Sequence, residues 1–260
     1  MNIVTACDSK FFHCLQKLAL SVKKFYNQQL IVYDIGLTDE ERKSLDAYII
    51  RMNVDVDFYN YTTYKNVPYI QATHKPFCVK HYFEHFSEPM ILVDSDCLFR
   101  EQVQEYGFDV GVTLKPPHRL NLKDHYKGIL NTGVIFFNTN ATILVESWLR
   151  ECRKPNTTDQ KALTDILSET IEWKHYDKLY DWKGLKIKVF KIDEYNDYYL
   201  KNGKILHFKG ERHRKDVYEK LIQAMEENVD IYHLFRELTA KPKKSFVKSL
   251  LQQLFRKSLQ

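Results

Sequence analysis

Short apolar runs alternate with helical patterns along most of the chain. Ile3–Ala6 and Met90–Val93 are brief and almost continuously apolar, which is typical of strands buried on both faces of a sheet. Between Phe12 and Tyr26, apolar residues recur at helical spacing. The same reasoning predicts strands at 3–6, 30–35, 54–59, 90–93, 109–114, 133–138, 186–192 and 204–208, and helices at 12–26, from 39 onward, 76–86, 141–152, 158–169 and 216–226. This alternation predicts an α/β fold with a mostly parallel, Rossmann-like sheet flanked by helices.

The start of one helix is marked by the local sequence Thr38-Asp39-Glu40-Glu41. The Thr38 hydroxyl can accept a hydrogen bond from a backbone N–H of the first turn, and the Glu41 carboxylate can reach back to the N–H of Thr38. We therefore predict a capping box that opens a helix here.

Basic residues are concentrated at the end of the sequence. The chain carries 39 Lys and Arg against 34 Asp and Glu, but six of the basic residues and no acidic one lie in 241–260, so the remainder holds 33 against 34. A nucleic-acid-binding protein would spread basic residues over a docking face, so we expect no nucleic-acid partner. The change of composition predicts one domain at 1–240, followed by a basic amphipathic C-terminal helix at 241–260.

Residues 243–257 combine an apolar stripe with a basic face. The stripe consists of Phe246, Val247, Leu250, Leu251, Leu254 and Phe255. The basic side chains beside it are those of Lys243, Lys244, Lys248, Arg256 and Lys257. This combination suits the surface of an anionic membrane, so we predict a membrane contact through 243–257. The alternatives are a terminal helix packed on the body of the protein and an oligomer contact.

The five cysteines and the first residues bear on the compartment. The number of cysteines is odd and no Cys-x-x-Cys occurs, which disfavours a disulfide framework or a zinc cluster and favours a reducing compartment. Residues 1–5 read as the start of a strand and lack the basic segment and apolar run of a signal peptide. We therefore expect a cytoplasmic protein, with peripheral attachment to the inner face of the membrane as a further possibility.

Two carboxylates follow one of the buried strands. Met90–Val93 runs directly into Asp94-Ser95-Asp96, and ligands of open α/β sheets bind at the carboxyl ends of strands. Two acids at this place are costly unless a cation neutralises them, and oxygen ligands suit Mg²⁺ or Mn²⁺, which also bind diphosphates. The alternative is a solvated turn at the end of a strand.

A second polar group follows the last predicted strand. His207 could complete a metal site, Lys209 could hold a phosphate, and Gly210 would let the backbone approach a ligand closely. A lone His after a strand is more often a core or surface residue. The pairing with Asp94 and Asp96 makes His207 a candidate ligand.

Two further motifs accompany a strand and a helix start. Asn131-Thr132-Gly133 precedes an apolar run, with Gly133 where a side chain would obstruct, and Thr158-Asp159-Gln160 opens a helix. Their alternatives are a loop-to-strand transition and an ordinary helix N-cap.

These motifs together resemble the GT-A glycosyltransferases, and most closely family 8 and related retaining bacterial sugar transferases. The resemblance covers roughly residues 1–215. It rests on five motifs in order: Val4-Thr5-Ala6-Cys7-Asp8, Leu92-Val93-Asp94-Ser95-Asp96, Asn131-Thr132-Gly133, Thr158-Asp159-Gln160 and His207-Phe208-Lys209-Gly210. It implies transfer of a hexose from a nucleotide-diphosphate sugar, a UDP-sugar, to a glycan or glycolipid acceptor with retention of configuration.

The resemblance also implies roles for individual residues. The metal, Mn²⁺ or Mg²⁺, would be held by Asp94, Asp96 and His207. The donor-binding set comprises Thr5, Ala6, Asp8, Lys75, Asp94, Ser95, Asp96, Thr132, Gly133, His207, Lys209 and Gly210. The catalytic candidates are Asn131, Asp159 and Gln160. Within the donor-binding set, Ala6 and Asp8 would contact the base, and Lys209 and Gly210 would grip the diphosphate.

Three other functions remain open at this point. An inverting GT-A transferase would use Asp159 as its base. A nucleotidyltransferase would need a glycine-rich basic loop after the first strand, whereas Cys7–Phe11 contains no glycine. A non-catalytic binding protein of the same fold would have no need of an intact set of Asp94, Asp96 and His207.

Overall fold

A computed structural model describes residues 1–53, 63–64, 67–68, 73–115, 129–154, 157–171, 177–210 and 214–239. Contacts divide the chain into two compact units, Met1–Lys209 and Gly210–Gln260. The predicted division into 1–240 and 241–260 stays a prediction, and the proposed C-terminal helix and membrane segment at 243–257 lie outside the described residues, as does the strand expected at 54–59.

The first unit is built on an eight-stranded sheet in the order β10-β11-β8-β9-β6-β1-β2-β3. Its strands are β1 (Asn2–Cys7), β2 (Leu30–Asp34), β3 (Ala47–Arg51), β6 (Met90–Val93), β8 (Val110–Leu114), β9 (Leu130–Phe137), β10 (Leu179–Trp182) and β11 (Leu185–Phe190). Parallel pairing joins β3, β2, β1 and β6, and also β8 and β11. By contrast, β9 runs antiparallel to both β6 and β8, and β10 antiparallel to β11. The predicted mostly parallel α/β sheet is confirmed, with a reversal at β9 that periodicity did not indicate.

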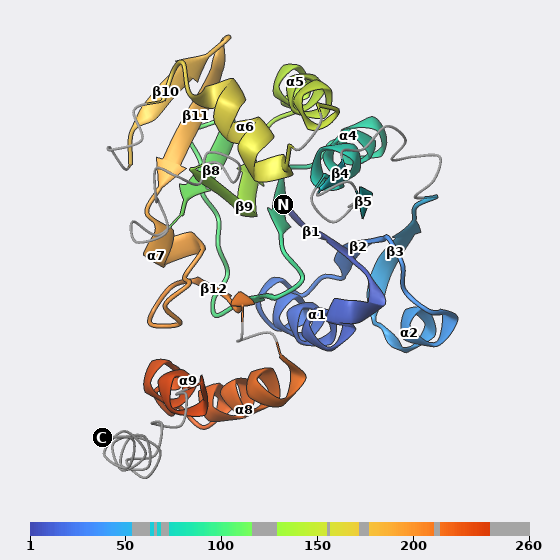
Figure 1. The fold of residues 1–260 in the computed structure, drawn as a ribbon, viewed down its shortest axis with the longest axis vertical. Helices are drawn as coiled ribbons and strands as arrows, with labels where there is room; N and C mark the ends of the chain where they lie inside the picture. Colours follow the sequence, from blue (N-terminus) through green and yellow to red (C-terminus); the bar gives the residue numbers. More distant parts are fainter. Residues whose placement is uncertain are drawn as a thin grey trace, which may run out of the picture. The chain divides into compact units, whose positions relative to one another are not determined.

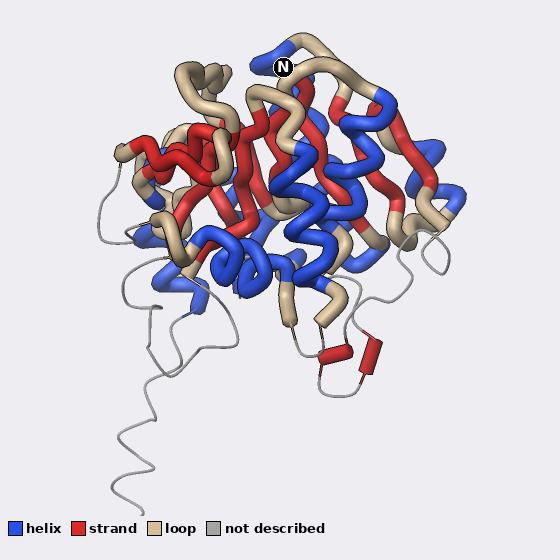
Figure 2. The backbone as a smooth tube through the Cα atoms, turned by 90° about the horizontal axis from the view of Figure 1, so that it is seen from above, coloured by secondary structure: helices blue, strands red, loops and turns tan. Residues whose placement is uncertain are grey.

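Helices cover both faces of this sheet (Figures 1 and 2). The helices of the first unit are α1 (Phe12–Tyr26), α2 (Asp39–Ser44), α4 (Lys75–His85), α5 (Thr142–Cys152), α6 (Asp159–Leu167) and α7 (Ile192–Tyr195), with a 3-10 turn η1 (Ser9–Phe11). One core cluster joins α4, α5 and α6 to the sheet, and the other joins α1 and the Tyr195 ring of α7 to the opposite face. Side chains alternate between them along β1: Val4 belongs to the first cluster, and Ile3 and Cys7 to the second.

The helix start predicted at Thr38 is confirmed. The Thr38 hydroxyl accepts from the Glu41 N–H at 3.2 Å, and the Glu41 carboxylate accepts from the Thr38 N–H at 2.8 Å. The helix that it opens, α2, is short, and the edge strand β3 begins three residues after it, at Ala47.

The first unit also contains a small antiparallel sheet. It consists of β7 (Cys97–Phe99) and β12 (Ile205–His207), with Cys97 paired to His207. Because β7 follows the turn after β6 directly, this pairing brings His207 next to the acidic motif. Two further short strands, β4 (Thr63–Tyr64) and β5 (Val67–Pro68), pair with each other.

The described part of the second unit contains α8 (Lys215–Glu226) and α9 (Ile231–Thr239), which contact each other. Residues Val217, Tyr218, Leu221 and Ile222 of α8 are buried at helical spacing. In the described ranges, no helix has the length and apolar character that crossing a membrane requires.

Candidate active site

The acidic motif lies at the carboxyl end of β6, near the middle of the sheet. All four residues of β6 are buried, and the Asp94 N–H continues the ladder by donating to the carbonyl of Gly133 at 2.8 Å. The chain then turns, because the Cys97 N–H donates to the carbonyl of Asp94 at 3.0 Å. As a result, the carboxylates of Asp94 and Asp96 lie close together just beyond the end of β6. The Asp94 side chain is 26% exposed and that of Asp96 is 10% exposed.

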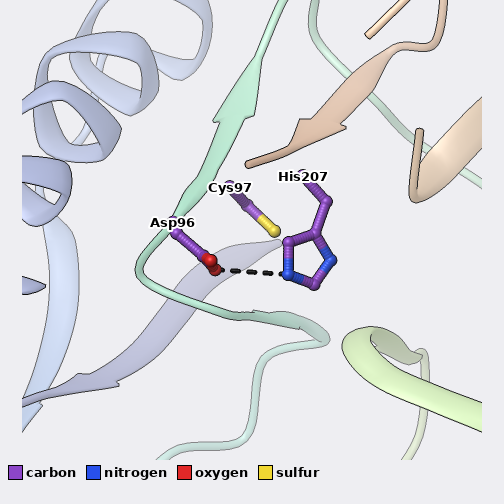
Figure 3. A group of neighbouring side chains, drawn as sticks. All are labelled: Asp96, Cys97 and His207. Carbon is purple, nitrogen blue, oxygen red and sulfur yellow. Dashed lines mark ion pairs between the residues drawn. The ribbon is translucent and has the colours of Figure 1, made fainter. Parts of the chain in front are cut away.

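His207 lies against these two carboxylates. Its Nε2 is 3.2 Å from Oδ1 of Asp96, as Figure 3 shows, and 3.5 Å from Oδ2 of Asp94. The side chain is fully buried, and Nε2 makes no hydrogen bond with any described residue. The other ring nitrogen, Nδ1, is 2.7 Å from Oδ1 of Asn196. A buried nitrogen that faces two carboxylates without a hydrogen bond is not a satisfied core group, and it could serve as a metal ligand.

Cys97 adds sulfur to the same place. One ligand atom from each of Asp96, Cys97 and His207 lies within 4.8 Å of the others, and Figure 3 shows the three side chains converging. Burial, followed by the charges of Asp96 and Asp94, raises the pKa of the Cys97 thiol well above its usual value, and the thiol points at the carbonyl of Gly133 at 3.5 Å. Sulfur is a soft ligand, whereas carboxylate oxygens and imidazole are donors that fit a harder divalent cation such as Mn²⁺ or Mg²⁺.

Lys75 joins the acidic motif to α6. It begins α4, is buried, and places Nζ 2.7 Å from Oδ1 of Asp94 and 3.2 Å from Oδ2 of Asp159. The same ammonium donates to the carbonyl and hydroxyl oxygens of Thr132 at 2.9 and 3.1 Å. Burial alone would lower the pKa of Lys75, but Asp159 and Asp94 outweigh it and hold that pKa above its usual value. Lys75 is therefore a permanent cation at the centre of the site.

The charge state of Asp94 follows from its neighbours. Burial by itself would raise the pKa of this carboxyl, but its neighbours, foremost the positive charge of Lys75, hold it well below its usual range. Asp94 is therefore ionised throughout the neutral range and can act as a ligand without first losing a proton.

A bulge in β9 shapes the floor of the site. Val112 pairs with Ile135, but the next residue of β8, Thr113, pairs with Asn131, so the intervening residues of β9 have no partner on β8. The bulge contains Thr132, which contacts Lys75, and Gly133. A Cβ at Gly133 would lie 2.3 Å from Cε1 of His207 and 2.7 Å from Oδ1 of Asn131, so only glycine fits there.

The start of α6 supplies Asp159 and Gln160. Thr158 caps this helix by accepting from the Lys161 N–H at 3.2 Å, and Asp159 is buried in the first turn. Both carboxylate oxygens of Asp159 are engaged: Oδ1 accepts from the Gln160 N–H at 2.7 Å, and Oδ2 accepts from the Thr132 hydroxyl at 2.9 Å and from Lys75. Within the described ranges, the buried Oε1 of Gln160 makes no hydrogen bond.

The remaining predicted residues lie around this centre. The Thr5 hydroxyl donates to the carbonyl of Val93 at 2.8 Å, so this side chain ties β1 to β6. Ala6 packs against a core cluster, and the Asp8 carboxylate caps η1 by accepting from the Lys10 N–H at 3.1 Å. These contacts are local and join neither side chain to the cluster around Asp94.

Three further predicted residues belong to the acidic and histidine motifs. Ser95 is buried. Nζ of Lys209 lies 3.5 Å from the Tyr198 hydroxyl, and its charge lowers the pKa of Asp94. Gly210 has φ of 75° and begins the second unit.

Sequence reasoning did not identify Asn196, Thr113 or Cys97. Asn196 and Thr113 belong to no motif, and only the pairing of distant segments brings Asn196 to His207 and Thr113 to Asn196. Cys97 adjoins the acidic motif, and its position next to two acids was the one signal available in the sequence.

Known proteins resemble this chain in three-dimensional structure but not in sequence. The sequence matches no protein-family model and no curated protein. Among the solved structures that it resembles is an active-site variant of LgtC, with a TM-score of 0.50, 14% identity, and 94% of this chain and 98% of LgtC covered. Another is the bifunctional glycosyltransferase WbbM, with a TM-score of 0.52, 10% identity, and 81% of this chain and 46% of WbbM covered. A further one is a glycosyltransferase involved in the glycosylation of the major capsid of PBCV-1, with a TM-score of 0.52, 12% identity, and 84% of this chain and 98% of that chain covered. Membership of family 8 stays a prediction. The chain has the fold of glycosyltransferases, as its five motifs indicated.

Proposed function

We propose that this chain is a metal-dependent glycosyltransferase that moves a hexose from a nucleotide-diphosphate sugar, a UDP-sugar, to a glycan or glycolipid acceptor. The observation that carries the proposal is the buried Nε2 of His207, which faces Asp94 and Asp96 at the carboxyl end of β6 without a hydrogen bond from any described residue. In a fold shared with glycosyltransferases, this place is where a nucleotide sugar and its cation would bind.

Asp94, Asp96 and His207 would hold Mn²⁺ or Mg²⁺. When bound, the cation supplies positive charge against the diphosphate, whose negative charge grows as the bond to the anomeric carbon breaks. Lys209 adds a second positive charge on the same side. A diphosphate stabilised in this way leaves without a proton, so no protein carboxyl has to act as an acid, in contrast to a glycosidase.

Lys75 would prepare the site before the donor arrives. Its ammonium fixes Asp94, Asp159 and Thr132 relative to one another through contacts between 2.7 and 3.2 Å. Because these groups are held together in advance, binding the donor sugar costs little reorganisation. Asn131 and Gln160 would lie near the reacting sugar, and Ala6 and Asp8 near the base, as the resemblance implies.

Retention of configuration is favoured by the contacts of Asp159. An inverting enzyme would need this carboxylate to take a proton from the acceptor hydroxyl. Its two oxygens already accept hydrogen bonds from Gln160 and Thr132 and pair with Lys75, so both are engaged within the protein rather than free to face an acceptor hydroxyl. The geometry therefore supports a structural role for Asp159 and a retaining reaction.

The test is release of UDP from a panel of UDP-sugars in the presence of Mn²⁺, combined with calorimetric titrations of UDP. We expect metal-dependent UDP binding and slow hydrolysis of one donor, both of which His207→Ala weakens through its metal affinity. Consumption of a sugar phosphate and a nucleoside triphosphate would instead identify a nucleotidyltransferase. Binding of UDP-sugar without turnover, with or without lipid or glycan acceptors, would identify a binding protein.

A membrane contact through residues 243–257 completes the proposal. It is motivated by the basic and apolar sequence pattern and by a glycolipid acceptor, which would place the enzyme on the cytoplasmic face of the membrane. In sedimentation with anionic liposomes at low salt, the full chain should be found in the liposome pellet, and a chain that ends at Ala240 should stay in the supernatant. If both stay in the supernatant, the membrane contact is wrong.

A further inference from the structure

Asn196 is held rigidly beside β12. It follows α7 directly and is fully buried. The next residue, Asp197, folds the chain back: its carboxylate accepts from the backbone N–H groups of Tyr199, Lys201 and Gly203 at 2.8, 2.7 and 3.1 Å. The chain then returns as β12, which pairs with Asp197: the Asp197 N–H donates to the carbonyl of Ile205, and the His207 N–H donates to the carbonyl of Asp197. This pairing fixes the backbone of Asn196 next to β12. Such a buried amide, fixed by its neighbour, is rigid enough to orient another side chain.

A chain of hydrogen bonds sets the direction of this amide. It begins at the backbone carbonyl of Asn131, which can only accept, so the Thr113 hydroxyl donates to it at 3.3 Å. The Thr113 oxygen then accepts from Nδ2 of Asn196 at 2.8 Å. Oδ1 of Asn196 is thereby turned toward His207, whose Nδ1 lies 2.7 Å away and must be the donor. The opposite amide orientation would give up the bond between Thr113 and Asn131.

The consequence falls on the other nitrogen of the His207 ring. A neutral imidazole with its hydrogen on Nδ1 carries a lone pair on Nε2. That lone pair points at Asp96 and Asp94, 3.2 and 3.5 Å away, which are acceptors like itself. Three acceptors that converge in a buried place suit a cation, and a carbonyl that binds the far N–H holds the ring in the ligating tautomer.

We propose that Asn196 is a positioning residue that fixes the tautomer and orientation of His207, and thereby sets the affinity of the site for its divalent cation. This inference rests on the proposed function only in that His207 is a ligand. It assigns to Thr113 a smaller part, since its hydroxyl keeps the amide the right way round.

The experiment measures Mn²⁺ affinity by calorimetry on the full chain without donor. Asn196→Leu keeps the number and branching of the side-chain heavy atoms and removes both hydrogen bonds, and we expect its affinity to fall on the order of 10-fold to 100-fold. Asn196→Asp keeps an acceptor for Nδ1 and should restore most of the affinity. Thr113→Val removes one hydroxyl and should give a smaller loss, which also provides a test if Asn196→Leu does not fold. Unchanged Mn²⁺ affinity in folded Asn196→Leu, or in Thr113→Val when the leucine variant is unfolded, overturns the inference.

A second readout reports the tautomer itself. Long-range ¹H–¹⁵N spectra of histidine-labelled protein saturated with Mg²⁺ should show His207 protonated at Nδ1, and a proton on Nε2 alone would overturn the inference. The His207→Ala variant separates this result from the proposed function. If it binds Mn²⁺ as well as the unaltered protein does, His207 is no ligand and the metal assignment itself fails. If it loses binding while Asn196→Leu does not, only the positioning role fails.

Discussion

Replacing Gly133 with alanine tests the geometry of the site through a single methyl group. The bulge in β9 brings Gly133 so close to His207 that a Cβ would stand 2.3 Å from Cε1 and 2.7 Å from Nδ1 of the ring. Ordinary contacts begin at 3.4 Å, so the ring has to retreat by about 1 Å. Its way back is limited, because Nδ1 is bonded to Asn196 at 2.7 Å and the Tyr198 ring lies against it with centroids 4.8 Å apart.

The size of the effect follows from that displacement. Overpacking in a dense interior costs roughly 1–3 kcal/mol in the free energy of unfolding. A shift of about 1 Å also breaks the bond to Asn196 and moves Nε2 away from the two carboxylates, and a displacement of this size can lower activity on the order of 100-fold. We expect Gly133→Ala to fold, with moderately reduced stability, and to lose most of its Mn²⁺-dependent UDP binding.

The assay pairs urea denaturation with calorimetric titration of UDP at several Mn²⁺ concentrations. Gly111→Ala is the matched control, because a Cβ there would lie 2.5 Å from the Phe190 ring and 3.0 Å from the Phe108 ring, away from the ligands. The control should lose a comparable amount of stability and keep its metal dependence. If Gly133→Ala binds Mn²⁺ and UDP as tightly as the unaltered protein, the close approach of β9 to His207 has no bearing on the site, and our reasoning is refuted.

Three further predictions concern the charged groups. Asp96→Ala should abolish Mn²⁺-dependent UDP binding in calorimetry with little change in melting temperature, and full activity with metal still required would contradict the assignment. Lys75→Met leaves the buried Asp159 and the partly buried Asp94 without their cation, so in EDTA we expect the free energy of unfolding at neutral pH to fall by about 3–5 kcal/mol. Because Lys75 lowers the folded pKa of Asp94, this stabilisation is present above the ordinary carboxyl pKa of about 3.9 and is lost as the pH falls through the folded value, so urea midpoints of the two proteins should converge in acid. Asp159→Asn should retain measurable transfer, and NMR of the product should show an α-linkage from an α-configured donor; a β-linkage would refute retention.

Much of the fold could be read from local sequence. Continuous apolar runs such as Met90–Val93 mark central strands, because a strand covered by helices on both faces has no polar side. The capping box at Thr38 and Glu41 is complete within four residues, so its prediction needed no tertiary information. Asp94 and His207 lie far apart in the sequence, and it was the order of motifs shared with glycosyltransferases that put them in one site.

The sequence by itself thus determined the alternation of strands and helices and the kinds of side chain that stand at the ends of the strands. Only the tertiary structure decided the antiparallel course of β9, its bulge at Gly133, the bridge that Lys75 forms, and the amide of Asn196 behind His207. The physical reason is that side-chain periodicity reports which faces of an element are buried but not which strand lies next to it or in what register. Contacts such as that between Asn196 and His207 require segments distant in the sequence to be placed to within a few tenths of an ångström. These segments meet only when the sheet has formed.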